Sequence, residues 1–597
     1  MNEPRLAQPA RTDASCEARQ LTMRGRRLLR IASAVVGSGF VVAGCGDPFT
    51  TGEGSSGGVA GAPTDALGGV GAGGEANSRG GMNAGSATGG SGSGGTAPSA
   101  SGAGGEGGAP FDGVGGACST GESPAIAACT VIESLGIFVS PRGSDEKGSG
   151  TREAPFGTLA KAIAEARKQS KRVYACSSAG AFEETVTLDA TFDQTELYGG
   201  FDCLDWSYSG ESPTAVVSGE PRALVASDLT SLVIEDFSFS AADAIEPGAS
   251  SAAAWIANSK VVVLRRVLLT AGKGADGAEG AGTREPAAKG ADGSPGVDAC
   301  KALHAPNEGG AAVETLCDGE AAGSIGGTGG DGGSDNKSAL SGSPGEPISL
   351  ERGQAGWGQT AGTTWNCAVG AGLGGGQMGS DGLPQPPAAG ALTSANDQGS
   401  LTALTFVGLT GQNGANGSPG QGGGGGGGAM APLSCGGVLP RTGASGGSGG
   451  AGGCGGRGGK GGGSGGGSFA LVSFHSNVAL EGGVLTARSA GRGGNGGHGQ
   501  PGGAGGVGGP PGKGASGSVP ACSGATGGKG GDGGHGGGGA GGPSAAVAYA
   551  GWAPTKIGTL LKIPKAAASG GADGAGSSKG AGAGSAGTVA EVLALSG

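Results

Sequence analysis

The chain has 597 residues, and 148 of them are glycine, about a quarter of the total where ~7% is usual. Hydrophobic residues make up only 36%, so a buried core has to be concentrated in part of the chain. The net charge of −11 argues against nucleic-acid binding, which requires basic patches that neutralise phosphates.

The N-terminal segment is typical of an export signal. The sequence MRGRRLLRIASAVVGSGFVVAGC starts at Met23, an alternative start, and places four arginines before an apolar stretch at 31–43. That stretch is too short to cross a bilayer as a stable helix. Its end, VAGC, resembles the cleavage motif of bacterial lipoproteins. The resemblance implies a signal peptide over 1–45, acylation of Cys45 and, because Gly46 follows it, an outer-membrane or cell-surface location. A plain secretory signal is the alternative.

Cysteine usage agrees with export. Of the 12 cysteines, Cys16 precedes the signal and Cys45 would carry lipid, which leaves 12 − 2 = 10. An even number in an exported chain indicates disulfides, although spacing does not reveal the pairs. No pair has the CxxC spacing of a structural zinc site. The candidates are Cys118, Cys129, Cys176, Cys203, Cys300, Cys317, Cys367, Cys435, Cys454 and Cys522.

Residues 46–117 contain almost no large apolar side chains, so we expect a disordered tether there. Beyond this segment, apolar residues occur in regular patterns. GIFV at 136–139 and RVYAC at 172–176 predict strands, and 158–166 predicts a short helix with its apolar residues on one face.

This region resembles a known fold family. The segments IFVSPRGSDEKGSGTREAPFGTLAKAIAEA, RVYACSSAGAFEETVTL and ELYGGFDCLDW are similar to the opening of right-handed parallel β-helix proteins of the pectin-lyase-like superfamily. The resemblance covers residues 136–206. It implies an all-β fold in which 118–271 form the N-terminal cap and the first rungs. It does not imply an activity, because the fold hosts both enzymes and binding proteins.

Units with a small-residue opening and a pair of apolar strands recur at Ser251, Ser468 and Ser544, with a shorter copy at Ser400. Such units with insertions at one fixed point predict a solenoid with loops on one side. The predicted divisions are a glycine-rich insertion at 272–399, a rung strand at 400–408, an arm at 409–467, a rung at 468–490, an arm at 491–543, a rung at 544–567 and a glycine-rich C-terminal segment at 568–597 ending in a short strand.

The insertions have a period of their own. Glycine occupies every third position from Gly443 to Gly461, from Gly493 to Gly508 and from Gly524 to Gly542. Three residues per turn is the period of the polyproline II helix, and bare edges allow backbones to approach closely. We therefore expect packed, polyglycine-II-like arms, resembling known glycine-rich bundles and PGRS-type repeats. A disordered linker and a collagen strand are the alternatives.

Two sets of charged residues have testable positions. Superposing the candidate rungs 231–239 and 261–269 places Glu235 over Arg265 and Asp236 over Arg266, as cross-strand partners or as unrelated solvated pairs. Folding residues 493–542 about a turn near Gly517 places His498 level with His535. This pair could bind a metal, but solvated side chains are the simpler interpretation. Cysteines within such arms could link neighbouring arms.

No catalytic set is evident, and we expect no cofactor and no metal. The stretches GKGADGAEG and GGDGGHGGGG lack the aliphatic residue of calcium-binding repeats. His304 and His475 have no evident partner. Charged residues on the exposed edge argue against ice binding. The tryptophans could stack on sugars, although scattered tryptophan more often packs in a core. They are Trp206, Trp255, Trp357, Trp365 and Trp552.

The sequence therefore favours a non-enzymatic surface lipoprotein with a structural or adhesive role. Its expected partners are a membrane, through the lipid, and cell-surface polysaccharide or envelope components, but not nucleic acid. One alternative is a polysaccharide-processing β-helix enzyme, either a lyase or a hydrolase. The other is a secreted matrix-like protein with disordered glycine-rich regions.

Overall fold

The computed structural model describes residues 119–597, apart from 302–305, 319–322, 395–396 and 438–439. The predicted signal peptide, Cys45, the tether, Cys118 and His304 lie outside these residues. Strands dominate the described part of the chain, which contains a single α-helix and two short 3-10 helices. The helices are α1 (Leu159–Gln169), η1 (Ala128–Thr130) and η2 (Ala190–Phe192).

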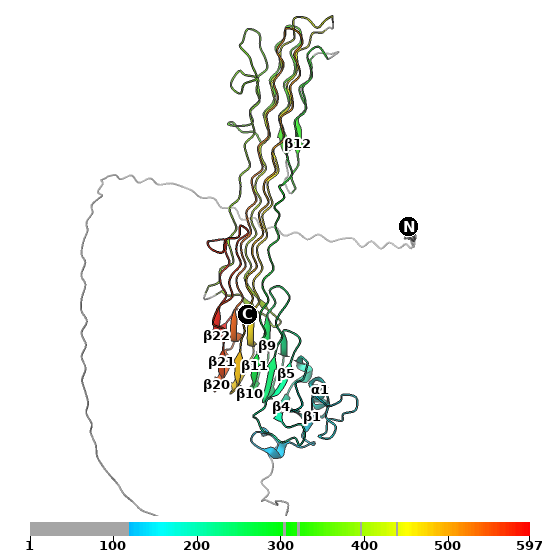
Figure 1. Ribbon diagram of the computed structural model, residues 1–597, viewed down its shortest axis with the longest axis vertical. Helices are drawn as coiled ribbons and strands as arrows, with labels where there is room; N and C mark the ends of the chain where they lie inside the picture. Colours follow the sequence, from blue (N-terminus) through cyan, green and yellow to red (C-terminus); the bar gives the residue numbers. More distant parts are fainter. Residues whose placement is uncertain (1–118, 302–305, 319–322, 395–396, 438–439) are drawn as a thin grey trace, which may run out of the picture. The chain divides into compact units, whose positions relative to one another are not determined.

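Three parallel sheets make up the body of the protein (Figure 1). The first sheet has the order β1 (Gly136–Val139), β2 (Arg172–Cys176), β4 (Thr195–Phe201), β7 (Leu232–Glu235), β10 (Val262–Arg265), β17 (Val478–Glu481) and β20 (Thr555–Ile557). The second has the order β21 (Leu560–Lys562), β18 (Val484–Thr486), β11 (Leu268–Thr270), β8 (Phe237–Ser240) and β5 (Thr214–Val217). The third has the order β22 (Val589–Ala594), β19 (Ser544–Ala550), β16 (Ser468–Phe474), β9 (Ser251–Ala257), β6 (Arg222–Ser227) and β3 (Val186–Leu188).

From β7 onward the chain visits the sheets in a fixed order: first, second, third, then first again. The recurring units stack as predicted, because Ser468 pairs with Ser251 on one side and with Ser544 on the other. Three long insertions, 271–467, 487–543 and 563–588, each leave after a strand of the second sheet and return at a strand of the third. The prediction that insertions occur at one fixed point is therefore confirmed.

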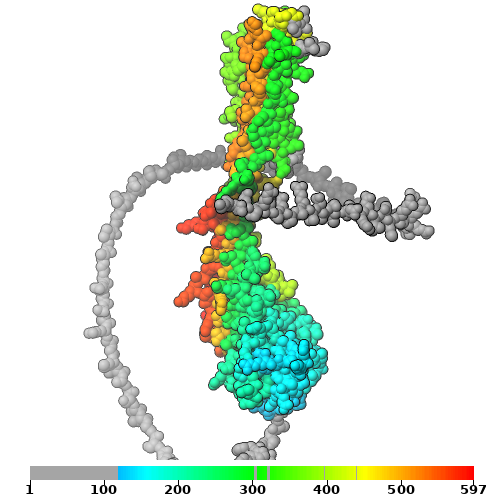
Figure 2. Space-filling model, turned by 45° about the vertical axis from the view of Figure 1, so that its right-hand side comes forward, coloured from blue at the N-terminus to red at the C-terminus, as the bar shows by residue number. Residues whose placement is uncertain are grey.

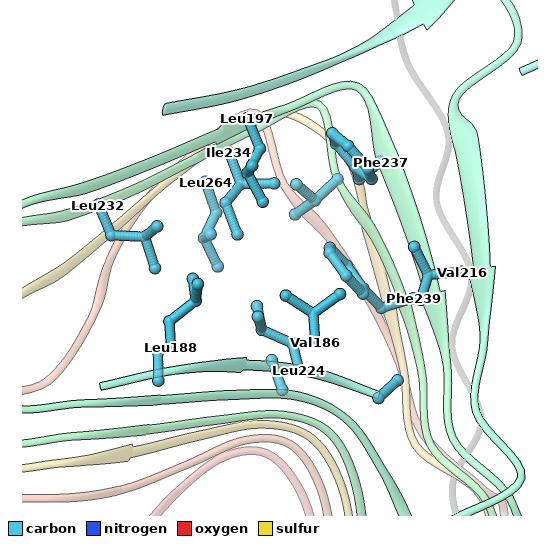
Figure 3. Packing of buried hydrophobic residues seen from close by; sticks show 14 of the residues in the cluster. Val186, Leu188, Leu197, Val216, Leu224, Leu232, Ile234, Phe237, Phe239 and Leu264 are labelled. Carbon is cyan, nitrogen blue, oxygen red and sulfur yellow. The ribbon is translucent and has the colours of Figure 1, made fainter. Parts of the chain in front are cut away.

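The core lies between the sheets, and it is built from columns of equivalent side chains. Leu197, Ile234 and Leu264 occupy matching positions on three neighbouring strands and are fully buried. Figure 3 shows them pointing across the interior toward Val186, Leu188 and Phe239. Because each rung repeats the pattern of the rung before it, one apolar column continues through the stack.

The helix α1 packs its apolar face into this core, at the end of the stack where β1, β2 and β3 lie. Thr158 caps it, with its side chain accepting a hydrogen bond from the Lys161 amide. Its buried residues are Leu159, Ala162, Ile163 and Ala166. The predicted helix and its apolar face are confirmed.

The prediction of a rung strand at 400–408 is wrong. This segment forms a small antiparallel hairpin of β14 (Ser400–Leu401) and β15 (Phe406–Val407), outside the three sheets. Leu401 and Phe406 pack on Trp255 and Phe469, which project from the side of the third sheet opposite the main core. The strands are too short for a rung, so the segment covers a sheet instead of extending it. A second antiparallel pair, β12 (Val313–Thr315) and β13 (Ser324–Gly326), lies within the first insertion.

The glycine-rich segments run side by side and hydrogen-bond to one another (Figures 1 and 2). The 443–463 run lies in the middle, and its amides follow the period of three. The amide of Gly449 donates to Gly327, that of Gly450 to Ala525 and that of Ala451 to Ala291, so successive residues bond three different segments. The carbonyls of the run accept from two further segments, 411–426 and 494–512.

Close contact explains why these positions are glycine. A Cβ on Gly449 would lie 1.9 Å from the Gly423 carbonyl oxygen, and a Cβ on Gly450 would lie 2.1 Å from that of Gly506. The third edge of the run carries Ser448, Ala451 and Cys454, which are small and buried. The predicted packing of the arms is thus observed as a hydrogen-bonded bundle.

Candidate functional site

The first sheet brings its charged residues together on the face away from the core. Arg265 stands between Glu235 and Glu481 in the strand register. Its Nη1 donates to Glu235 Oε1 at 2.6 Å, and its Nε donates to Glu481 Oε2 at 2.6 Å. The predicted pairing of Glu235 with Arg265 is confirmed, and Glu481 extends it by one rung.

Arg266 completes the predicted second pair. Its Nε donates to Asp236 Oδ1 at 2.8 Å and its Nη2 to Glu235 Oε2 at 3.0 Å. Ser123 Oγ also donates to Glu235, and Tyr208 donates to Asp236 Oδ2 at 2.8 Å. The hydrogen bond to Asp236 raises the pKa of Arg266, and burial raises the pKa of Tyr208 to about 12.

Glu235 and Asp236 are almost fully buried, with 1% and 2% of their surfaces exposed. All four of their carboxylate oxygens accept hydrogen bonds from arginine, serine or tyrosine. A buried carboxylate paired in this way is compensated and has no oxygen directed at a substrate. The arrangement is that of a structural ion-pair network.

The two histidines of the second long insertion, 487–543, meet as the hairpin prediction requires. Their ring centroids lie 5.9 Å apart, and Gly517 sits in the turn with a positive φ. The Gly499 amide donates to His535 Nδ1 at 3.0 Å, while His498 Nε2 lies 2.6 Å from the Arg284 guanidinium. Burial, followed by the nearby Arg284 charge, lowers the pKa of His498. A guanidinium at this position competes with a metal ion, and the described residues contain no group of three potential metal ligands.

Four disulfides are defined within the described residues. Cys176–Cys203 lies in the body, whereas Cys300–Cys435, Cys317–Cys454 and Cys367–Cys522 join separate glycine-rich segments. Cys129 is disulfide-bonded as well. The prediction that cysteines link neighbouring arms is confirmed, and Cys454 in the middle run is one of those links.

The tryptophans divide into packing and exposed residues. Trp206 packs against Phe138, and Trp255 is buried under the Arg222 guanidinium and donates to the Ala403 carbonyl. Trp365 donates to the Trp357 carbonyl within the first insertion. Trp357 and Trp552 expose 55% and 65% of their surfaces, so they are the candidates for contact with a ligand.

Trp552 lies in a groove with a volume of about 720 Å³, formed where the third sheet turns into the first. Its lining comes from three successive turns, those between β9 and β10, between β16 and β17, and between β19 and β20. The lining residues are Asn258, Ser259, Lys260, His475, Asn477, Trp552 and Ala553.

Each of these turns begins with a residue in the left-handed backbone conformation: Asn258, His475 or Gly551, with φ values of 51°, 45° and 89°. The next residue in the first two turns is a buried serine. Ser476 Oγ accepts a hydrogen bond from the Ser259 amide, which ties the two turns together. In the third turn the equivalent residue is Trp552, whose indole is too large for that interior position and is exposed instead.

Sequence reasoning named Trp552 and His475 separately but did not bring them together with Asn258, Lys260 and Asn477. The sequence pattern that groups these turns is present in the recurring units. Aligned on their strands, ANSK, FHSN and AGWA put tryptophan where the other two copies have serine.

Comparisons with protein families, curated proteins and solved structures find no match for this chain. The α-helix of the described part has 11 residues, and no helix there has the length and apolarity to cross a membrane.

Proposed function

We propose that the chain is an exported surface lipoprotein with a structural or adhesive role. Its body is a right-handed parallel β-helix, and its bundle is built of polyglycine-II-like arms. The strand order supports the β-helix, because each turn adds one parallel strand to each of three sheets. Crossover connections between parallel strands are almost always right-handed.

The disulfides between glycine-rich segments carry this proposal. They join residues 135, 137 and 155 positions apart, so they close long loops in which glycine is costly to order. Such bonds form and persist in oxidising compartments outside the cytoplasm. An exported chain with VAGC at the end of its signal has Cys45 as the site of lipid attachment.

A structural role also accounts for the ion-pair network better than catalysis does. A polysaccharide lyase or hydrolase works through carboxylates, or a cation with a basic residue, that face the substrate. Glu235 and Asp236 instead have their oxygens occupied by protein donors. They stabilise the stacking of β7 on β10.

The test is metabolic labelling with an alkyne fatty acid in a bacterial host, comparing the unchanged chain with Cys45→Ala. We expect labelling to be lost in Cys45→Ala and kept in Cys16→Ala, the matched control that removes the other cysteine of the N-terminal region. Equal labelling of Cys45→Ala would contradict the anchor. Free thiols at Cys300, Cys317 or Cys367 in the cell-surface protein would contradict the export argument independently.

A further inference from the structure

The groove at Trp552 has features that the structural role does not require. The indole is 65% exposed, in a turn whose two equivalents below it place a small serine in the interior. A large aromatic side chain left outside a core is typical of a binding surface, because its face is apolar and its N–H can donate. Trp552 lies in the last of the three stacked turns, and its side chain lines the groove instead of packing in the interior.

Apart from Ala553, the remaining lining residues are polar, and two of them are basic. Asn258 and Asn477 present amides that both donate and accept hydrogen bonds. Lys260 and His475 add donors, and no lining residue is acidic, although the whole chain has a net charge of −11. Asp228, which is not part of the lining, accepts a hydrogen bond from Asn258 at 3.2 Å. Among the described residues, Lys260 makes no ion pair.

The imidazole of His475 lies against two neighbouring groups. Its ring packs edge-on against Phe474, with centroids 4.4 Å apart, and a Cβ on Gly551 would lie 2.9 Å from its Nδ1. Glycine at 551 therefore allows the ring to sit against the next turn. The groove combines an imidazole, two amides, an ammonium without an ion pair and an exposed indole across adjacent rungs.

These groups together define a class of ligand. An indole face stacks on the apolar face of a sugar ring, amides satisfy hydroxyl groups, and an ammonium pairs with an anion. Neighbouring strands lie about 4.8 Å apart, so three turns span about 10 Å, which is a length for more than one sugar ring. We propose that this corner groove binds an anionic polysaccharide, with one sugar ring on Trp552 and its carboxylate, sulfate or phosphate at Lys260.

This inference goes beyond the proposed function, since it names a ligand for the body and does not depend on lipid at Cys45. The test uses the purified full-length chain and four probes: polygalacturonic acid, dextran sulfate, a phosphate-bearing teichoic acid and uncharged dextran. Binding is measured by calorimetry at two salt concentrations. We expect at least one charged polymer to bind more tightly than dextran, and the preferred probe identifies the anion.

Three variants locate the site. Trp552→Ala is expected to weaken binding about tenfold or more, and Lys260→Gln about threefold to tenfold with a smaller salt dependence. Trp357→Ala removes the other exposed tryptophan and is expected to leave binding unchanged. Because Trp552 and Lys260 are exposed, all three variants should keep the circular dichroism spectrum of the unchanged chain.

Several results would overturn the inference. Binding to none of the charged polymers would refute it, as would equal affinities of the Trp552→Ala and Trp357→Ala variants. Equal affinity for dextran and the charged polymers, with no effect of Lys260→Gln, would refute the anionic ligand. Each of these results is independent of the fatty-acid labelling, so failure of the groove and failure of the anchor are distinguishable.

Discussion

Replacing a single glycine in the middle of the bundle tests how closely its segments pack. In Gly449→Ala the new Cβ would lie 1.9 Å from the Gly423 carbonyl oxygen, whereas real Cβ contacts essentially never fall below 3.0 Å. The two segments must therefore separate by at least 3.0 − 1.9 = 1.1 Å. That movement breaks the 2.9 Å hydrogen bond from Gly423 to Gly450 and strains the 2.7 Å bond from Gly449 to Gly327.

The cost follows from those two bonds. A buried donor or acceptor left without a partner costs about 1–3 kcal/mol, so the substitution should destabilise the bundle locally by about 2–5 kcal/mol. Alanine restricts the unfolded chain more than glycine does, which offsets about 0.4–1 kcal/mol of this. The net loss, about 1–5 kcal/mol, should raise the open fraction of the bundle by a factor of about 5 or more.

The assay is native-state proteolysis followed by mass spectrometry, because cleavage of a transiently open segment reports its opening free energy. Gly463→Ala is the matched control, since it makes the same substitution in the same run and its Cβ would meet nothing closer than 3.0 Å. We expect rapid cleavage near 449 in the first variant and little change in the second. Cleavage of both variants at the rate of the unchanged chain would refute the close packing of the bundle.

Three further predictions concern the body and the links. Glu235→Gln should lower the free energy of unfolding by about 1–3 kcal/mol because its partners keep their charges, while Glu481→Gln, at the solvent-exposed end of the same network, should cost under about 1 kcal/mol in chemical denaturation. Cys454→Ser should lower the free energy of unfolding by about 2–4 kcal/mol and make the 443–463 run more sensitive to protease. If the variant is as stable and as protease-resistant as the unchanged, disulfide-bonded chain, the disulfide is not a structural link. The pKa of Tyr208 is raised to about 12, so its contribution to stability should be complete below pH 10 and be lost as the pH rises toward 12. Ultraviolet titration of the phenolates should show this late step, and Tyr208→Phe should remove it.

The stacking of the body could be predicted because its signals are local and repeat. Serine openings at 251, 468 and 544 mark the same point of each rung, and once they are aligned the register of the next strand follows. The pairing of Glu235 with Arg265 follows from superposing the apolar rungs 231–239 and 261–269. The hairpin at 400–408 was misassigned because an apolar pair such as Leu401 and Phe406 suits the outside of a sheet as well as a rung.

Apart from the hairpin that brings His498 to His535, the neighbours in the bundle could not be predicted, for a reason that lies in the period itself. A glycine run looks the same after every shift of three residues, so its composition does not say which segment it meets. Gly446 bonds Gly330 and Gly447 bonds Cys522, yet nothing at either glycine distinguishes the two partners. The cysteines break this symmetry, because a disulfide such as Cys317–Cys454 holds only when the segments are in one register.

The groove shows how a binding surface can be hidden in a repeat. Within one unit, Trp552 looks like any apolar residue near the end of a strand. Only the alignment of turns shows that it replaces the interior serines at 259 and 476, and only the structure shows the hollow beside it. At this position the other copies have a small residue that is buried and hydrogen-bonded. A larger residue there does not meet the same packing requirement. The other rungs of the stack repeat the same packing. The replacement of a buried serine by an exposed tryptophan is therefore a better indicator of a binding surface than the presence of tryptophan itself.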